Sequence, residues 1–142
     1  GHILSHDQIE AVLMRNAGMK FMCREVFLRV ERSDTPFTGR YNAGDVLRVP
    51  VAHGEGNYIA DAETIARLEG EGLVLFRYAS PEGKLDPAWN HNGSTNAIAG
   101  ILSEKLNVLG LMPHPENHVD PVVGPVDGRR FFESIAETLQ AA

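Results

Sequence analysis

The stretch AIAGILSEKLNVLGLMPHPE, residues 97–116, carries the strongest indication of the fold. It contains two apolar runs, 97–102 and 107–112, separated by the polar segment SEKL. Apolar runs this short, bounded by turn-forming residues, favour buried strands over helices. The second run passes directly into Pro113-His114-Pro115-Glu116. The sequence therefore predicts a buried sheet in which one strand ends at a histidine and a carboxylate.

Further strands are predicted from alternation and from β-branched and aromatic residues. In residues 19–30, Val26, Leu28 and Val30 fall on one face and Arg29 on the other, as in a strand with one solvated side. Two more apolar segments read as strands, over 73–78 and over 46–58, where the run enters a glycine-rich loop.

A short helix is predicted for the segment DAETIARLEGEG. Asp61 can cap its N-terminus, and Ile65 with Leu68 would form its buried stripe. Gly70 or Gly72 would end it, because glycine readily adopts the conformation that terminates helices.

A second, amphipathic helix is predicted near the end of the chain, over residues 126–140. Phe131, Ile135 and Leu139 recur every fourth residue, and Asp127 lies near the start. Strands thus alternate with few helices. This pattern fits an α/β or an α+β domain and does not separate the two.

The first dozen residues differ from the rest of the chain. Gly1-His2 is typical of a protease-cleavage scar, which takes no part in a fold. Ser5 could cap a short helix in which Ile9, Val12 and Leu13 fall at helical spacing.

The composition is that of one soluble globular domain. The chain has 142 residues, 43% of them hydrophobic, and a net charge of −6 at pH 7. This acidic balance gives no indication of a nucleic-acid or anionic membrane partner, and the apolar runs are too short to span a bilayer. The one cysteine, Cys23, excludes an intrachain disulfide and fits a reducing cytoplasm. Its place within a predicted strand favours a buried, inert thiol.

The PHPE segment has the residue types of a general base and its orienting partner. A residue before proline favours an extended backbone, and prolines have a fixed φ, so His114 and Glu116 should point the same way. A carboxylate beside an imidazole fixes its tautomer and leaves the other ring nitrogen free to take a proton. The alternative is an ordinary surface contact in a loop.

Two other interpretations involve further histidines. His114, Glu116, His118 and Asp120 are all potential metal ligands, although no standard zinc motif such as HExxH is present. The segment HGEGNY, which begins at His53, has glycines that indicate tight turning of the backbone, around a ligand or simply in a turn.

Several segments, in the same order, resemble one known family. The chain is similar to the glutaminase subunits of phosphoribosylformylglycinamidine synthase (PurQ), which are class I, triad-type glutamine amidotransferases. The resemblance rests on RNAGMKFMCREVFLRVERSDTPFT, VPVAHGEGNYIAD, LEGEG, NGSTNAIAGI, NVLGLMPHPENHVD and DGRRFFESI, which begin at Arg15 and end at Ile135. It implies the C-terminal part of a three-layer, flavodoxin-like α/β fold.

The resemblance also implies a function. The expected reaction is the release of ammonia from glutamine by a Cys-His-Glu triad, for conversion of formylglycinamide ribonucleotide to its amidine in purine synthesis. His114 and Glu116 match the family's histidine and glutamate, and His53 matches a stretch near the glutamine pocket. The implied partners are a large synthetase subunit, which uses ATP and Mg²⁺, and a small bridging subunit. No cofactor is expected in this chain.

One part of the family pattern is missing from this sequence. The nucleophile elbow, of the type GxCNGxQ, should precede LMRN, where the chain has GHILSHDQIEAV instead. Cys23 is not expected to replace it, because it lies downstream within the matched region. We therefore expect residues 1–12 to be a tag scar or linker and residues 13–142 to be the C-terminal portion of an amidotransferase domain. This portion should be inactive alone and prone to self-association through exposed strand edges.

Overall fold

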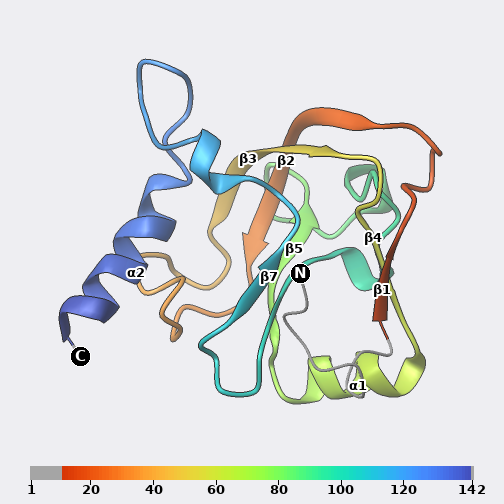
Figure 1. Ribbon diagram of the computed structural model, residues 1–142, viewed down its shortest axis with the longest axis horizontal. Coiled ribbons are helices and arrows are strands. Elements are labelled where there is room, and N and C mark those ends of the chain that lie inside the picture. Colours follow the sequence, from red (N-terminus) through yellow and green to blue (C-terminus); the bar gives the residue numbers. More distant parts are fainter. Residues whose placement is uncertain (1–10, 142) are drawn as a thin grey trace.

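The computed structural model describes residues 11–141 and is built around a five-stranded sheet (Figure 1). The strand order is β3-β2-β5-β6-β7, and each of the four neighbouring pairs is antiparallel. The strands are β2 (Met22–Val30), β3 (Val46–His53), β5 (Val74–Ala79), β6 (Ile98–Leu102) and β7 (Leu109–Leu111).

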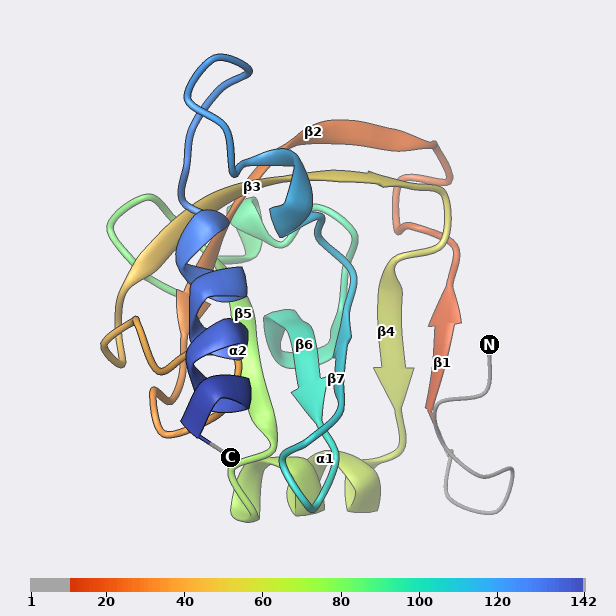
Figure 2. The same ribbon diagram turned by 60° about the vertical axis from the view of Figure 1, so that its left-hand side comes forward.

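A two-stranded ribbon and two α-helices surround this sheet. Strand β1 (Ala11–Met14) pairs antiparallel with β4 (Asn57–Ala60). Figure 2 shows α2 (Arg129–Ala141) along one side of the sheet, α1 (Ala62–Gly70) across one end, and the ribbon on the far side from α2. Short 3-10 turns are η1 (Pro87–Trp89), η2 (Thr95–Ala97) and η3 (Pro115–Asn117).

The α/β class is confirmed, and so are the predicted strands of the main sheet and the two predicted helices α1 and α2. Strand β2 alternates as expected, because Val26, Leu28 and Val30 are at most 2% exposed. In α1, Asp61 accepts a hydrogen bond from Thr64 N at 2.7 Å and so caps the helix. Among residues 11–141, neither α-helix is long and apolar enough to cross a membrane.

Helix α2 is held to the sheet by aromatic packing. The Phe131 ring lies 6.4 Å from that of Phe76 on β5 and 6.0 Å from that of Phe37, centroid to centroid. The predicted stripe includes Ile135, which packs against the core, but does not continue to Leu139, which is 73% exposed.

Two expectations about the N-terminal third are wrong where the structure describes it. Val12 and Leu13 lie in β1 and pair with Ile59 and Tyr58, so strand pairing overrides their helical spacing. Ser5 and Ile9, the rest of the predicted helix, lie outside the described residues.

Cys23 is exposed rather than buried. It pairs with Ala52, which is also exposed, in the first part of β2, where the strand pairs with β3 alone. The buried positions of β2 begin only at Val26. Alternation alone does not show which part of a long strand has a second layer over it.

The sheet curls so that one loop contacts strands near both of its edges. After β7, Met112 N donates to Ala99 O of β6 at 3.2 Å, and His114 N donates to Pro50 O of β3 at 2.8 Å. Two residues span at most about 7 Å. The end of β7 and the middle of β3, at opposite edges of the strand order, are therefore neighbours (Figure 2). The PHPE segment forms this connection.

Candidate active site

The PHPE segment forms the contact that the sequence predicts, with a different backbone. His114 is the residue before the 3-10 turn η3, with φ −111° and ψ 79°, and Glu116 lies inside the turn. The expected extended conformation is therefore wrong beyond His114, because the fixed φ of Pro115 suits the first position of a helical turn. The turn brings Glu116 Oε1 to 2.7 Å from His114 Nδ1.

This geometry is suited to proton transfer. A carboxylate accepting from Nδ1–H places the lone pair of His114 on Nε2 and stabilises the imidazolium that forms when Nε2 takes a proton. The His114 side chain is 39% exposed, so a reacting group can approach it. The site lies at the end of β7.

The chain that enters helix α2 supports the loop from behind. Gly128 N donates to His118 O at 2.9 Å, and Gly128 packs against the backbone of Pro115. A Cβ at Gly128 would lie 2.0 Å from Pro115 O. A side chain at this position therefore requires the loop to move.

We expect Gly128→Ala to lower the free energy of unfolding by about 2 kcal/mol, because the added methyl overpacks the contact with Pro115. The His114–Glu116 pair should shift with the loop, which NMR of the His114 ring would detect. Gly124→Ala is the matched control, since a Cβ there has no atom within 4 Å. Equal stability of the two variants in urea unfolding would contradict the expectation.

The structure does not bring the four possible metal ligands together. His118 is buried, and its Nδ1 donates to Arg48 O at 2.7 Å. Asp120 accepts from Val122 N at 2.9 Å within its own turn. No group of three His, Cys, Asp or Glu side chains among residues 11–141 is arranged to hold a metal ion.

His53 is the last residue of β3 and interacts electrostatically with His114. Its side chain is buried, and its Nδ1 lies 2.9 Å from Asn16 Oδ1. Burial lowers the pKa of His53, and the charge of His114 lowers it further. Its Nε2 has no hydrogen-bond partner among the described residues. Strand β3 thus positions both histidines, His53 by its own backbone and His114 through Pro50.

The lowered pKa of His53 predicts a loss of stability in mild acid. Below its ordinary value of 6.5, the unfolded chain binds a proton that the folded chain excludes. Unfolding in urea should therefore become easier from about pH 7 to about pH 5.5. His91 adds to this trend, because burial and then Arg24 lower its pKa. In His53→Gln the slope should be shallower, and an unchanged slope would contradict the assignment.

An open cavity of about 490 Å³ adjoins His53. Basic and acidic side chains both line it, namely Arg15, Lys20 and Glu55, together with the ring of Phe21. Such a lining can pair with both charges of a small zwitterion.

Comparison with known proteins shows the family. Residues 2–137 match the CobB/CobQ-like glutamine amidotransferase domain. The chain belongs to this family. The match crosses residue 12, so the domain boundary expected there remains a prediction.

Two relatives of this amidotransferase domain are both named phosphoribosylformylglycinamidine synthase subunit PurQ. The protein from Bradyrhizobium diazoefficiens is 64% identical over 134 residues, which are 94% of this chain and 58% of that protein. A protein from Thermus thermophilus is 58% identical over 131 residues, which are 92% of this chain and 57% of that protein. The chain thus spans somewhat more than half the length of these relatives.

The amidotransferase domain is also similar to a solved structure, that of PurLQS from Thermotoga maritima. The TM-score is 0.74 at 38% sequence identity, over 92% of this chain and 54% of that one. This likeness confirms the α/β amidotransferase fold.

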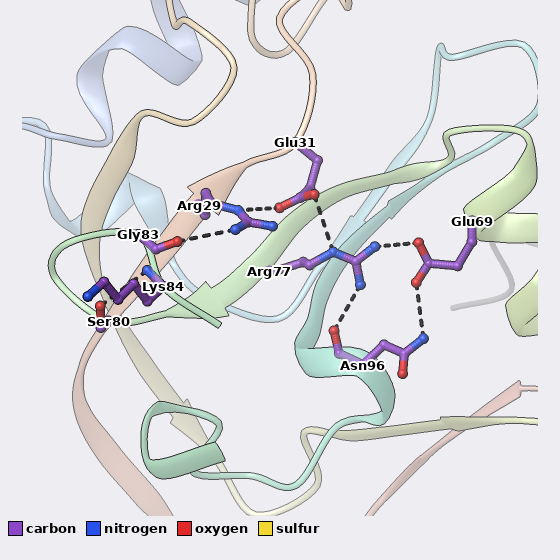
Figure 3. Close-up of polar contacts among 8 residues, drawn as sticks. All are labelled: Arg29, Glu31, Glu69, Arg77, Ser80, Gly83, Lys84 and Asn96. Atoms are coloured by element: carbon purple, nitrogen blue, oxygen red, sulfur yellow. Dashed lines mark hydrogen bonds and ion pairs between the residues drawn. The ribbon is translucent and has the colours of Figure 1, made fainter. Parts of the chain in front are cut away.

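A second polar centre of the amidotransferase domain surrounds Arg77 (Figure 3). Arg77 lies on β5, and its side chain is only 9% exposed. It pairs with Glu31 Oε2 at 3.3 Å and Glu69 Oε2 at 2.5 Å, and it donates to Asn96 O at 2.8 Å. Each of its nitrogens has a partner, so this centre connects β2, α1, β5 and η2. It is a structural network beside an open cavity of about 570 Å³.

Two buried polar residues were not identified from the sequence. Arg77 lies within the apolar run LVLFRY. A charged residue in such a run indicates a buried, paired side chain, so Arg77 could have been identified. Asn16, 1% exposed, follows the short apolar segment AVLM and has no distinguishing pattern.

Proposed function

We propose that this amidotransferase domain takes part in releasing ammonia from glutamine, for the conversion of formylglycinamide ribonucleotide to formylglycinamidine ribonucleotide in purine biosynthesis. The contact of 2.7 Å between His114 Nδ1 and Glu116 Oε1 carries the proposal. The name of the two relatives, phosphoribosylformylglycinamidine synthase subunit PurQ, supports the same reaction.

In the proposed mechanism a cysteine thiolate attacks the carbonyl carbon of the glutamine side-chain amide. His114 Nε2 takes the thiol proton and returns it to the nitrogen, so that the C–N bond breaks, ammonia leaves and a thioester remains. Water then attacks the thioester, again losing its proton to His114, and glutamate and the thiol are released. Glu116 stabilises each imidazolium form of His114.

We place the nucleophile outside this chain, in the part of the relatives that it does not span. Its one cysteine, Cys23, lies in the exposed first part of β2. The GxCNGxQ elbow of the family pattern does not occur in this sequence. The isolated chain is therefore expected to be inactive by the triad route.

The cavity beside His53 is the proposed position of the glutamine head group. Arg15 and Lys20 can pair with its carboxylate, and Glu55 with its ammonium group. His53 is the proposed substrate contact. The proposed partners are a large synthetase subunit, which would use ATP and Mg²⁺, and a small bridging subunit, in the cytoplasm. The similar structure from Thermotoga maritima, PurLQS, supports such a complex.

Glutamine hydrolysis by the purified chain tests the proposal. The chain is assayed alone and mixed with the segment of the Bradyrhizobium PurQ protein that it does not span. Ammonia release only in the mixture is expected. Activity of the chain alone would place the nucleophile at Cys23, and a mixture that assembles without activity would refute the proposal.

A second candidate function is that of a catalytically incompetent assembly module. Exposed apolar side chains on and near β1 favour it, among them Val12, Leu13 and Met14 at 48–54% exposure. A groove of about 260 Å³ adjoins them, between Leu13 and Tyr58 of the ribbon and Ile101 and Leu111 of the sheet. Assembly with the added segment, without hydrolysis, would distinguish this function from the first.

A further inference from the structure

We propose that Asn16 is a positioning residue that holds His53 in its Nδ1–H tautomer, so that the bare Nε2 accepts a hydrogen bond from an N–H group of the amide substrate. The positioning role stands on the contacts of Asn16 alone. The part that concerns the substrate rests on the proposed function.

The orientation of the Asn16 amide follows from its backbone partners. Its Nδ2 lies 2.8 Å from both Lys20 O and His53 O, and these carbonyls can only accept. Its Oδ1 lies 3.1 Å from Gly56 N, which can only donate. A flipped amide would set a donor against a donor and an acceptor against two acceptors. Oδ1 therefore faces Gly56.

The same oxygen decides the tautomer of His53. Oδ1 lies 2.9 Å from His53 Nδ1, and an oxygen without a hydrogen can only accept. Nδ1 must carry the proton, and Nε2 of the neutral ring is then a lone pair. Asn16 is 1% exposed, so water does not compete for these bonds.

Gly56 fixes the ring itself. A Cβ at Gly56 would lie 2.2 Å from Cε1 and 2.4 Å from Nδ1 of His53, so the ring packs directly on the glycine backbone. Asn16 sets the protonated edge of the ring, and Gly56 sets its plane. The lone pair on Nε2 of His53 therefore points in one fixed direction.

The lone pair on His53 Nε2 needs a hydrogen-bond donor. His53 is 7% exposed, and its Nε2 is buried without a partner among residues 11–141. A buried lone pair without a hydrogen bond is unfavourable unless a ligand completes it. Glutamine offers N–H groups in its side-chain amide and its ammonium group, and His53 adjoins both the basic cavity and His114.

Nitrogen-15 NMR of the His53 ring tests the positioning role in the chain without any activity. At about pH 8.5 the ring is neutral, and coupling patterns distinguish Nδ1–H from Nε2–H. The wild-type chain should show Nδ1–H. In Asn16→Asp one carboxylate oxygen still accepts from Nδ1, so the tautomer should be retained, while the other oxygen faces Lys20 O and His53 O and should lower stability. Asn16→Ala should shift the population toward Nε2–H. Asn107→Ala, which removes an exposed amide, is the control.

An Nε2–H tautomer in the wild-type chain would overturn the proposal, and so would an unchanged tautomer in folded Asn16→Ala. A merely structural role of Asn16 would lower stability and leave the tautomer of the folded protein unaltered.

The substrate part is tested in the mixture described above. Asn16→Ala should raise the KM for glutamine about tenfold with little change in kcat, as expected for the loss of one binding hydrogen bond. An unchanged KM in a variant whose tautomer has switched would overturn this part. If the wild-type mixture releases no ammonia, the proposed function and the substrate part fail together, while the NMR result still decides the positioning role.

Discussion

Arg77→Met is expected to lower the free energy of unfolding by about 3 kcal/mol. The substitution keeps an apolar stem on β5 but leaves Glu31 and Glu69 without the cation between them. Removing one partner from a buried ion pair costs more than the pair contributes, because the remaining charge is poorly solvated. We place the effect at the lower end of the usual range, since Glu69 is 37% exposed. Urea unfolding followed by circular dichroism measures it.

The control for this variant is Arg67→Met, which removes an arginine from an exposed pair. Arg67 and Glu104 are 46% and 64% exposed and lie 3.2 Å apart. Such pairs contribute under about 1 kcal/mol. If both variants lost equally little stability, the buried network would have no greater role than a surface contact.

The Arg77 network also has a pH signature. Arg77, and then Asn96, lowers the pKa of Glu69 below its ordinary value of 4.5. Stability from this bond is present above that value and is lost as the pH falls through the folded-state pKa. The acid limb of the stability curve should therefore be shallower in Arg77→Met than in the wild-type chain.

His114→Ala is expected to reduce kcat for glutamine hydrolysis in the reconstituted mixture by about 10²–10⁴-fold, the usual contribution of a positioned general base. The His114 side chain is 39% exposed and makes one side-chain bond, to Glu116, so folding should be little changed. Ammonia release under saturating glutamine measures the effect.

The control is His91→Ala, which removes an imidazole that contacts Trp89 and no part of the PHPE segment. It should retain the wild-type kcat. Glu116→Gln should fall between the two variants, because the amide keeps the size of the carboxylate and loses its charge. A fully active His114→Ala mixture would remove His114 from the proposed mechanism.

The predictions that succeeded rest on signals within short segments. The cap at Asp61 and the alternation of β2 are written in neighbouring residues, and the structure confirms both. The contact between His114 and Glu116 was also predictable, because two residues of separation keep the side chains within reach.

The predictions that failed depend on residues that are far apart in the sequence. Cys23 is exposed because, among residues 11–141, the first part of β2 is less covered than the second. The role of Asn16 depends on His53, which lies 37 residues away, and Arg77 pairs with Glu31, which follows the last residue of β2. No local pattern encodes such pairings. The backbone of the PHPE segment was mispredicted for a local reason, since Pro115 can begin a turn as well as hold an extended chain.

The contact between His114 and Pro50, which joins the two edges of the curled sheet, should hinder the pairing of β3 with another chain. Strand β3 ends the strand order and would offer its outer edge to any extended chain. At Pro50 that edge has no N–H, and its carbonyl is already occupied by His114 N. The loop that carries His114, the proposed base, therefore also blocks the outer edge of β3. An engineer who replaces it to change the chemistry would also expose a template for aggregation, so solubility and catalysis should be screened together.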